Sequence, residues 1–415
     1  MVTSSTEYEI DYDSQGVIEQ AFNEIRFTYG GSFSNLGWSV MSKRIEYPSI
    51  LKSTVEFNDG ISLTSYNRKY DFYSGEIIEV EKEDGYGLHY LTRTVPAYLK
   101  YPGMGLKSVS NFDHMLTQKT ASYTYRSNGS GTTLGNPLAA SVTTWNEDWK
   151  YRELQSNGEY LDGTSVDTRR AWRKHKTYVF KDETNPDGTF KNWNPSGSSD
   201  FNWANPSSQA IPWLRTGEIM RYDRYSKALE ERGIDDVYAS VKMGYDQTLP
   251  IITATPARYV EFAYSGAEDH MGSVNYFGGE VRGPSASALD NTRAHTGEYS
   301  VRLNASTRYG MNYQIYVGPY FDTPIGNQIA RQKYEARVRI HEDNISTGFN
   351  YLYCNYKDFN NNSLLWQGAK ISDATTIKAG EWYMIRLPID LTLASLANCI
   401  KIDIGTWVPC IAGNT

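Results

Sequence analysis

The sequence predicts an all-β protein in which antiparallel hairpin sheets are followed by a jelly-roll β-sandwich. Two segments, 70–98 and 222–246, each begin with Tyr-Asp and then run through alternating apolar and polar residues around a turn of Gly and acidic residues. Alternation places one face of a strand inward, and Gly with Asp favours tight turns. Because a single hairpin cannot bury its apolar face, repeated hairpins indicate a larger sheet. Residues 391–398 are the one segment in which we expect a helical turn.

The composition excludes two classes of partner. The 415 residues carry a net charge of −7, which gives no electrostatic reason to expect nucleic acid. Apolar runs stay well short of a bilayer span, so we expect no membrane insertion.

The first residues already alternate like a strand and lack the pattern of a signal peptide. We therefore interpret the chain as a fragment of a longer polypeptide.

The chain divides into three expected regions. Residues 1–125 are a strand-rich domain, in which Asn58-Asp59-Gly60 between alternating runs predicts a hairpin. Residues 126–272 form a Trp-rich β domain with a long loop over 191–213. Residues 227–233 could form one helical turn, but within the repeat we expect a strand. That loop either docks a partner or packs on its own sheet, and we favour self-packing. Short strands at regular spacing in 273–415 predict the sandwich.

Three cysteines, Cys354, Cys399 and Cys410, lie near the end of the chain. Cys399 and Cys410 flank an alternating segment and could form a disulfide that closes a small loop. Alternatively, all three are buried thiols, as free cysteines commonly are. The odd number of cysteines argues against a complete disulfide framework.

The Tyr-Asp positions carry a family resemblance. Tyr70, Asp71 and Gly75 precede an Asp84-Gly85 turn, and this pattern resembles the YD repeat of Rhs-type proteins. A second set fits less closely, because Ser226 stands where the repeat often has Gly; it comprises Tyr222, Asp223, Tyr245 and Asp246. The segments 238–269, 275–281 and 294–301 are similar to large Rhs-repeat surface proteins of gliding, Bacteroidetes-type bacteria.

The resemblance implies an extracellular protein at the cell surface, exported as cargo of the type 9 secretion system. The partner would then be the outer-membrane secretion machinery. In that family a β-rich region leads into a sandwich like a carbohydrate-binding module, which closes with an Asp-Asp-aromatic strand. This sequence lacks such a strand, so we expect a truncated sandwich. The Rhs core signature with its Asp-Pro cleavage site is also missing, so toxin delivery is not implied.

Catalytic motifs are missing from the sequence. Neither G-x-S-x-G nor H-E-x-x-H occurs, and the histidines are scattered. We therefore expect a non-enzymatic structural segment without a cofactor. The alternative is an extracellular carbohydrate-binding module whose partner is a polysaccharide, and a glycan-active enzyme ranks third.

Two kinds of ligand site remain candidates. Sugar rings stack on flat aromatic side chains, and four aromatic residues surround a polar loop in the expected sandwich: Tyr351, Tyr353, Tyr356 and Trp366. The simpler interpretation is that these rings pack both faces of a sheet. A structural calcium ion would need oxygen ligands in loops, and the resemblance points to Glu280 and Asp343.

Overall fold

The computed structural model is all-β, as the sequence predicts, and it describes most of the chain. The described residues are 2–13, 16–27, 40–45, 50–58, 60–106, 115–154, 160–163, 170–194, 201–208, 212–245, 247–270, 278–284, 286–303, 308–320, 325–343, 345 and 349–408. An N-terminal antiparallel sheet has the order β1-β2-β3, formed by Val2–Asp13, Gly16–Phe27 and Val40–Ile45.

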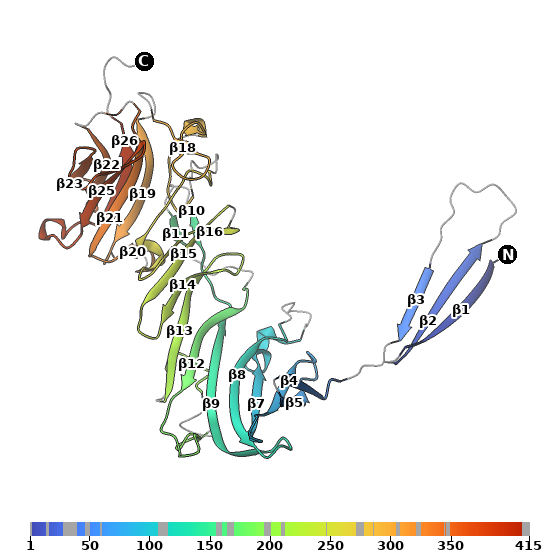
Figure 1. Ribbon diagram of the computed structural model, residues 1–415. Coiled ribbons are helices and arrows are strands. Elements are labelled where there is room, and N and C mark those ends of the chain that lie inside the picture. Colours follow the sequence, from blue (N-terminus) through green and yellow to red (C-terminus); the bar gives the residue numbers. More distant parts are fainter. Residues whose placement is uncertain are drawn as a thin grey trace.

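A long antiparallel sheet of eleven strands follows (Figure 1). Its strands pair in sequence order: β4 (Ser53–Asn58), β5 (Ile61–Tyr70), β6 (Ile77–Glu83), β7 (His89–Pro96), β8 (Lys119–Ser127), β9 (Thr133–Asn146), β12 (Arg173–Phe180), β13 (Trp213–Tyr222), β14 (Ala228–Gly233), β15 (Tyr238–Gly244) and β16 (Leu249–Ala254). A separate ribbon of β10 (Arg152–Leu154) and β11 (Tyr160–Asp162) interrupts this order between β9 and β12. Short 3-10 turns η1 (Ala97–Leu99) and η2 (Pro102–Met104) follow β7.

Several sequence expectations can be checked against this sheet. The hairpin at residues 58–60 is confirmed, because Asn58 pairs with Ile61 across a two-residue turn. The strand expected over 227–233 is confirmed as β14. The expected division between residues 125 and 126 falls inside β8, so it separates no sheets. Residues 259–266 alternate in the sequence in a way that predicts a strand, and this prediction is wrong: the segment begins with the 3-10 turn η3 (Tyr259–Glu261), where the Glu230 carboxylate accepts the Tyr259 backbone N–H.

One type of turn recurs at the ends of the hairpins. The first and fifth residues pair through their backbones, as in Asp84 with Leu88 and Asp223 with Lys227. In both turns the Asp Oδ1 accepts two backbone N–H groups, which is the Asx-turn chemistry. The fourth residue is left-handed, with φ +78° at Gly87 and +71° at Ser226. The first Tyr-Asp turn is one residue longer, pairing Asp71 with Glu76, and its left-handed residue is Gly75, with φ +73°. This conformation explains why Gly suits the position and why Ser226 departs from the pattern.

The first Tyr-Asp turn offers a direct test of what its aspartate does. Asp71 Oδ2 accepts the backbone N–H and the hydroxyl of Ser74, and Oδ1 accepts the hydroxyl of Tyr98. Asp71→Ala removes all three bonds, so we expect the free energy of unfolding to fall by about 1–2 kcal/mol. Asp71→Asn, which keeps an oxygen acceptor, should lose less. Chemical denaturation measures the difference, and equal stability of the Ala variant and the wild type would contradict the prediction.

The third Tyr-Asp position is only partly described. Tyr245 follows β15 in the turn to β16 with φ +50°, whereas Asp246 lies outside the described residues. The prediction that this pair repeats the turn chemistry of Asp71 and Asp223 therefore stays a prediction.

The described parts of the Trp-rich loop pack against the long sheet. Trp193 and Trp203 adjoin a cluster that contains Phe180 of β12 and Trp213 of β13, with the loop residues Phe190 and Phe201 between them. The rings meet mostly edge to face, with centroids 4.8 Å apart for Phe180 with Trp193 and for Phe201 with Trp203. This contact supports the self-packing interpretation, while 195–200 and 209–211 lie outside the described residues.

Two packed sheets form a β-sandwich at the C-terminal end. One sheet has the order β20-β19-β26-β22-β23, formed by Gln328–Ile329, Tyr309–Val317, Lys401–Trp407, Asn350–Lys357 and Ser363–Lys370. The other has the order β21-β25-β24, formed by Lys333–His341, Trp382–Asp390 and Ile377–Ala379. The chain crosses between the sheets repeatedly, as in a jelly roll, and side chains such as Ile385 and Ile402 fill the core between them.

Smaller elements complete the sandwich region. They are η4 (Ala286–Ala288), the ribbon of β17 (Leu289–Asp290) with β18 (Ser300–Val301), η5 (Ile325–Asn327) and η6 (Ala394–Leu396). The last of these confirms the helical turn expected in 391–398. Cys354 and Cys399 are free and buried, whereas Cys410 lies outside the described residues, so the pairing of Cys399 with Cys410 stays a prediction. Burial raises the pKa of the Cys354 thiol to about 12.

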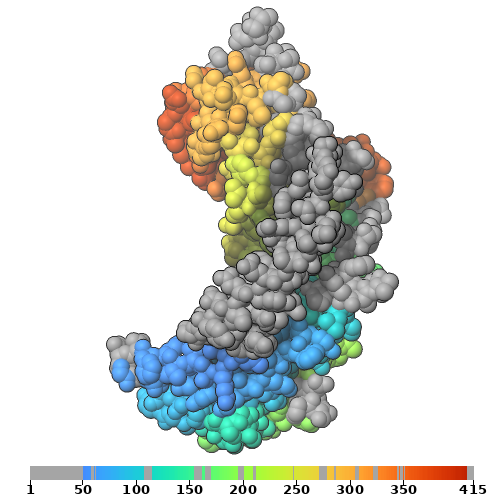
Figure 2. Space-filling model, turned by 90° about the vertical axis from the view of Figure 1, so that its right-hand side faces the viewer, coloured from blue at the N-terminus to red at the C-terminus, as the bar shows by residue number. Residues whose placement is uncertain are grey.

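The part of the molecule that is drawn in colour in Figure 2 is elongated. The sandwich lies at one end and the β4–β9 part of the long sheet at the other, with β13–β16 between them (Figures 1 and 2). In the part of the chain that the structure describes, no helix has the length and apolar character needed to cross a membrane.

Candidate functional site

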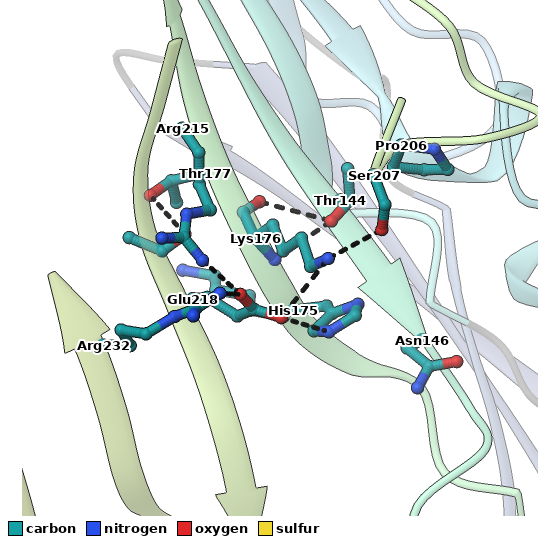
Figure 3. A network of polar contacts seen from close by, with 12 residues as sticks. Thr144, Asn146, His175, Lys176, Thr177, Pro206, Ser207, Arg215, Glu218 and Arg232 are labelled. Carbon is teal, nitrogen blue, oxygen red and sulfur yellow. Dashed lines mark hydrogen bonds and ion pairs between the residues drawn. The ribbon is translucent and has the colours of Figure 1, made fainter. Parts of the chain in front are cut away.

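The densest polar cluster on the long sheet is centred on Glu218 of β13 (Figure 3). Glu218 lies directly opposite Lys176 of β12 and opposite Arg232 of β14 in the strand register. Its Oε1 lies 3.3 Å from Lys176 Nζ and 3.4 Å from His175 Nε2, and its Oε2 lies 2.7 Å from Arg232 Nη2. Arg215, three residues earlier on the same strand, reaches Oε2 at 2.5 Å. Neighbouring strands thus bring four basic side chains to one carboxylate.

The electrostatics of this Glu218 cluster favour the charged carboxylate. Burial alone would raise the pKa of Glu218, but hydrogen bonds from His175, Arg232 and Arg215 and the charge of Lys176 hold it well below its usual range. A carboxylate so fully partnered cannot act as a general base near neutral pH. The cluster instead joins three strands by opposite charges across the ladder, which stabilises a sheet.

A second polar network lies where the long sheet meets the sandwich region. Arg152 of β10 binds Glu280 through two nitrogens, with Nη2 2.9 Å from Oε2, and its Nη1 donates to Asn327 Oδ1. Arg221 of β13 pairs with Asp162 of β11 and donates to the carbonyl oxygen of Gly326 at 3.2 Å. We call this set the junction network.

Lys242 of β15 completes the junction network from the long sheet. Its amine lies 3.3 Å from Glu280 Oε1 and 3.9 Å from the centroid of the Tyr259 ring. Burial lowers the pKa of Lys242 to about 7, although the charge of Glu280 opposes that shift. Burial would raise the pKa of Glu280, but the charges of Arg152 and Lys242 outweigh it and lower that pKa to about 2. The Glu280 carboxylate is therefore ionised and fully buried between two cations.

The four predicted sugar-binding aromatics do not share one surface. Tyr351 and Tyr356 lie in the sandwich core, with 5% and 0% of their surface exposed, so they cannot contact a sugar. The prediction is wrong for these two residues, because the strand register turns Leu352, Cys354 and Tyr356 inward and an irregularity between Asn350 and Leu352 leaves Tyr351 inside as well.

Tyr353 and Trp366 lie together on the outer face of the five-stranded sheet. Their rings are stacked, with centroids 6.2 Å apart and planes 13° from parallel, and Trp366 is 43% exposed. The Tyr353 ring lies over Gly405, where a Cβ atom would come within 2.7 Å of the tyrosine hydroxyl. Asn355 stands opposite Trp366 on one side and Asp403 on the other, which sets polar groups beside the rings. We call these four side chains the outer aromatic face.

The two calcium candidates have cationic partners. Glu280 is held by Arg152 and Lys242 in the junction network. Asp343 is exposed, with Oδ2 3.1 Å from Arg293 Nε and 3.4 Å from His341 Nδ1. Among the described residues, no group of three or more His, Cys, Asp or Glu side chains is arranged to hold a metal ion. The geometry thus gives the calcium prediction no support at either residue.

Sequence reasoning missed the Glu218 cluster and the junction network. A signal for the first existed, because residues 173–176 (Arg-Lys-His-Lys) lie on one expected strand and Arg215 and Glu218 on another. The junction network gave no such signal, since Arg152 and Glu280 are 128 residues apart in the chain.

In both charged clusters the carboxylates and the basic side chains form ion pairs with one another. Among the described residues, the outer aromatic face is the one predicted ligand surface whose side chains lie together. The Tyr-Asp turns and the outer face thus remain the features on which a functional assignment rests. Comparison with protein-family models, with curated proteins and with solved structures found no match to this chain.

Proposed function

We propose that this chain is a non-enzymatic structural segment of a large Rhs/YD-repeat protein of the bacterial cell surface, exported as type 9 secretion cargo. The observation that supports this proposal most directly is the eleven-stranded sheet, whose strands pair in sequence order and turn on recurrent Asx turns. Such a sheet grows by adding hairpins, which suits a repeat protein.

The charged clusters also suit a structural role. In each of them a buried carboxylate is held by several cations that come from different strands or segments. Removing either carboxylate would leave like charges facing one another. These side chains therefore join elements of the fold, and eleven strands in one sheet leave only two open edges, which limits unwanted strand pairing.

The proposal is tested on the protein in its own cells. Cells are crosslinked, the protein is captured with an antibody to this chain, and its intact mass and its co-purifying proteins are measured. A polypeptide much larger than 47.1 kDa that arrives with outer-membrane secretion components is the expected result. A free species of about that mass without such partners would overturn the proposal.

A second candidate function is carbohydrate binding at the outer aromatic face. Stacked Tyr353 and Trp366 rings offer a flat apolar surface, and Asn355 and Asp403 stand beside them in the strand register. A sugar ring could lie on the aromatic rings with its hydroxyl groups toward the polar side chains at their edge. This arrangement favours a binding role over catalysis.

We expect Trp366→Ala to weaken polysaccharide binding about fivefold or more, taking as a scale the roughly 1–3 kcal/mol that an aromatic ring contributes when it stacks on a nucleobase. Binding is measured by affinity electrophoresis in gels that contain soluble polysaccharides. Phe359→Ala serves as a matched control, since Phe359 is an exposed aromatic residue at the preceding turn and not part of the outer aromatic face. Equal retardation of the Trp366→Ala variant and the wild type would exclude this surface.

A further inference from the structure

A cavity of about 190 Å³ lies beside the junction network, where β13 and β15 approach the residues that precede the sandwich. Its lining includes Lys242, Asp223, Glu280 and several tyrosines. At about 30 Å³ for each water, a cavity of this size holds on the order of six water molecules. It therefore has room for one ligand no larger than a single sugar ring.

Two buried polar atoms of the lining have unused hydrogen-bonding capacity. Lys242, which is 1% exposed, forms an ion pair with Glu280, but its Nζ makes no hydrogen bond among the described residues. Asp223 is 6% exposed, and its Oδ1 accepts the backbone N–H groups of Tyr225 and Lys227. Its Oδ2 has no hydrogen-bond partner among the same residues. Because such atoms are rare in folded proteins, a ligand that both accepts and donates hydrogen bonds would stabilise the site.

The walls of the cavity restrict the ligand further. Four tyrosines line it: Tyr151, Tyr222, Tyr225 and Tyr259. Three of them are buried, whereas Tyr225 is 67% exposed and so stands at the rim. Flat aromatic rings next to a few convergent polar groups are typical of small-molecule pockets.

The charges around the cavity balance. Arg152 and Lys242 both contact the Glu280 carboxylate, Asp223 adds a second carboxylate, and Arg224, also in the lining, is paired with Glu153. Charges of both signs thus occur in similar number, so the lining does not select for a ligand of one net charge. The lining favours a neutral ligand with several hydroxyl groups and an apolar C–H face.

We propose that this cavity binds a single neutral sugar residue, with one hydroxyl donating to Asp223 Oδ2, another accepting from Lys242 Nζ, and the ring against the tyrosines. The site is separate from the outer aromatic face and goes beyond the structural role proposed above. Its residues come from β13 to β15 and the turns beside them, from β10 and η3, and from Gly279 and Glu280, so it depends on the contact of the long sheet with the junction network.

The test titrates the whole chain with D-glucose, D-galactose, D-mannose, L-fucose, D-xylose and N-acetyl-D-glucosamine, observed by saturation-transfer difference NMR. D-Glucuronate, an anion, and choline, a cation, are the charged comparators. We expect saturable binding of at least one neutral sugar in the millimolar range. Asp223→Asn keeps an oxygen for the turn but replaces the free acceptor with a donor, and Tyr225→Ala changes an exposed ring. Each should weaken binding about tenfold or more.

Trp366→Ala is the matched control, because it alters the outer aromatic face and should leave this binding unchanged. Thermal unfolding of each variant checks that folding is retained, and Lys242→Met gives a third probe if Asp223→Asn proves unstable. The proposal is overturned if no neutral sugar saturates, if a charged comparator binds more tightly, or if folded Tyr225→Ala binds as the wild type does.

Discussion

Replacing Glu280 by Gln is expected to lower the free energy of unfolding by about 3–5 kcal/mol, the range found when one partner of a buried ion pair is removed. The substitution keeps the shape of the side chain but leaves the charges of Arg152 and Lys242 without a counter-charge in a site where Lys242 is 1% exposed. Denaturant unfolding followed by both tryptophan fluorescence and far-ultraviolet circular dichroism measures the change. Both probes are needed, because a chain with several sheets can unfold in more than one step.

Two comparisons isolate this effect. Glu335→Gln removes a carboxylate from the exposed pair with Arg337, so its cost should stay within about 0.5 kcal/mol. The double variant Glu280→Gln with Lys242→Met removes both charges and should recover part of the loss, which a double-mutant cycle quantifies. A Glu280→Gln protein as stable as the Glu335→Gln protein would show that the junction network does not hold the long sheet to the sandwich region.

Glu218→Gln is expected to lower the free energy of unfolding by about 2–3 kcal/mol, because it leaves Lys176, Arg215 and Arg232 facing one another without a carboxylate. Glu218 itself is 8% exposed, so solvent only partly screens these charges. The same unfolding measurements apply. Glu231→Gln is the matched control, since Glu231 is an exposed carboxylate on neighbouring β14 and should change stability by no more than about 0.5 kcal/mol.

The effect of Glu218 should depend on pH in a defined direction. The pKa of Glu218 is lower in the folded protein than in the unfolded chain. Its contribution to the free energy of unfolding is therefore complete above the pKa of the unfolded chain, and it is lost as the pH falls toward the pKa of the folded protein. The stability difference between wild type and Glu218→Gln should thus be constant above a pH of about 5 and shrink in more acidic solution. A difference that grows on acidification would contradict the assigned ion pairs.

The sequence predicts local structure where the turn chemistry is local. Asn58 and Gly60 define a hairpin by themselves, and the position of 227–233 within the repeat identifies β14 although the segment also resembles a helical turn. The stretch 259–266 could not be predicted in the same way. It alternates like a strand, yet it begins with a 3-10 turn whose Tyr259 backbone N–H donates to Glu230, a residue of β14.

The candidate sites also depend on contacts between strands that are not encoded in short stretches of sequence. Tyr353 and Trp366 meet on one face because the register sets Tyr353 opposite Gly368 and Asn355 opposite Trp366, and the sequence does not specify that register. Alternation fails for Tyr351, since an irregularity in pairing changes which face the residue occupies. The contact of Glu280 with Arg152 and Lys242 depends on how the segment before the sandwich returns to the long sheet, and no short-range pattern encodes that return.

The pairing order of the long sheet has a mechanical consequence. From β4 to β9 and from β12 to β16, each strand is bonded to the strand that follows it in the chain. Tension along the chain would load these bonds one hairpin at a time from an open edge, so the sheet would lengthen in steps instead of shearing at once. The same neighbour-to-neighbour order lets each new hairpin add to the edge formed before it, because its contacts are close in sequence. A chain that emerges gradually through a narrow passage could therefore assemble this sheet strand by strand as it appears.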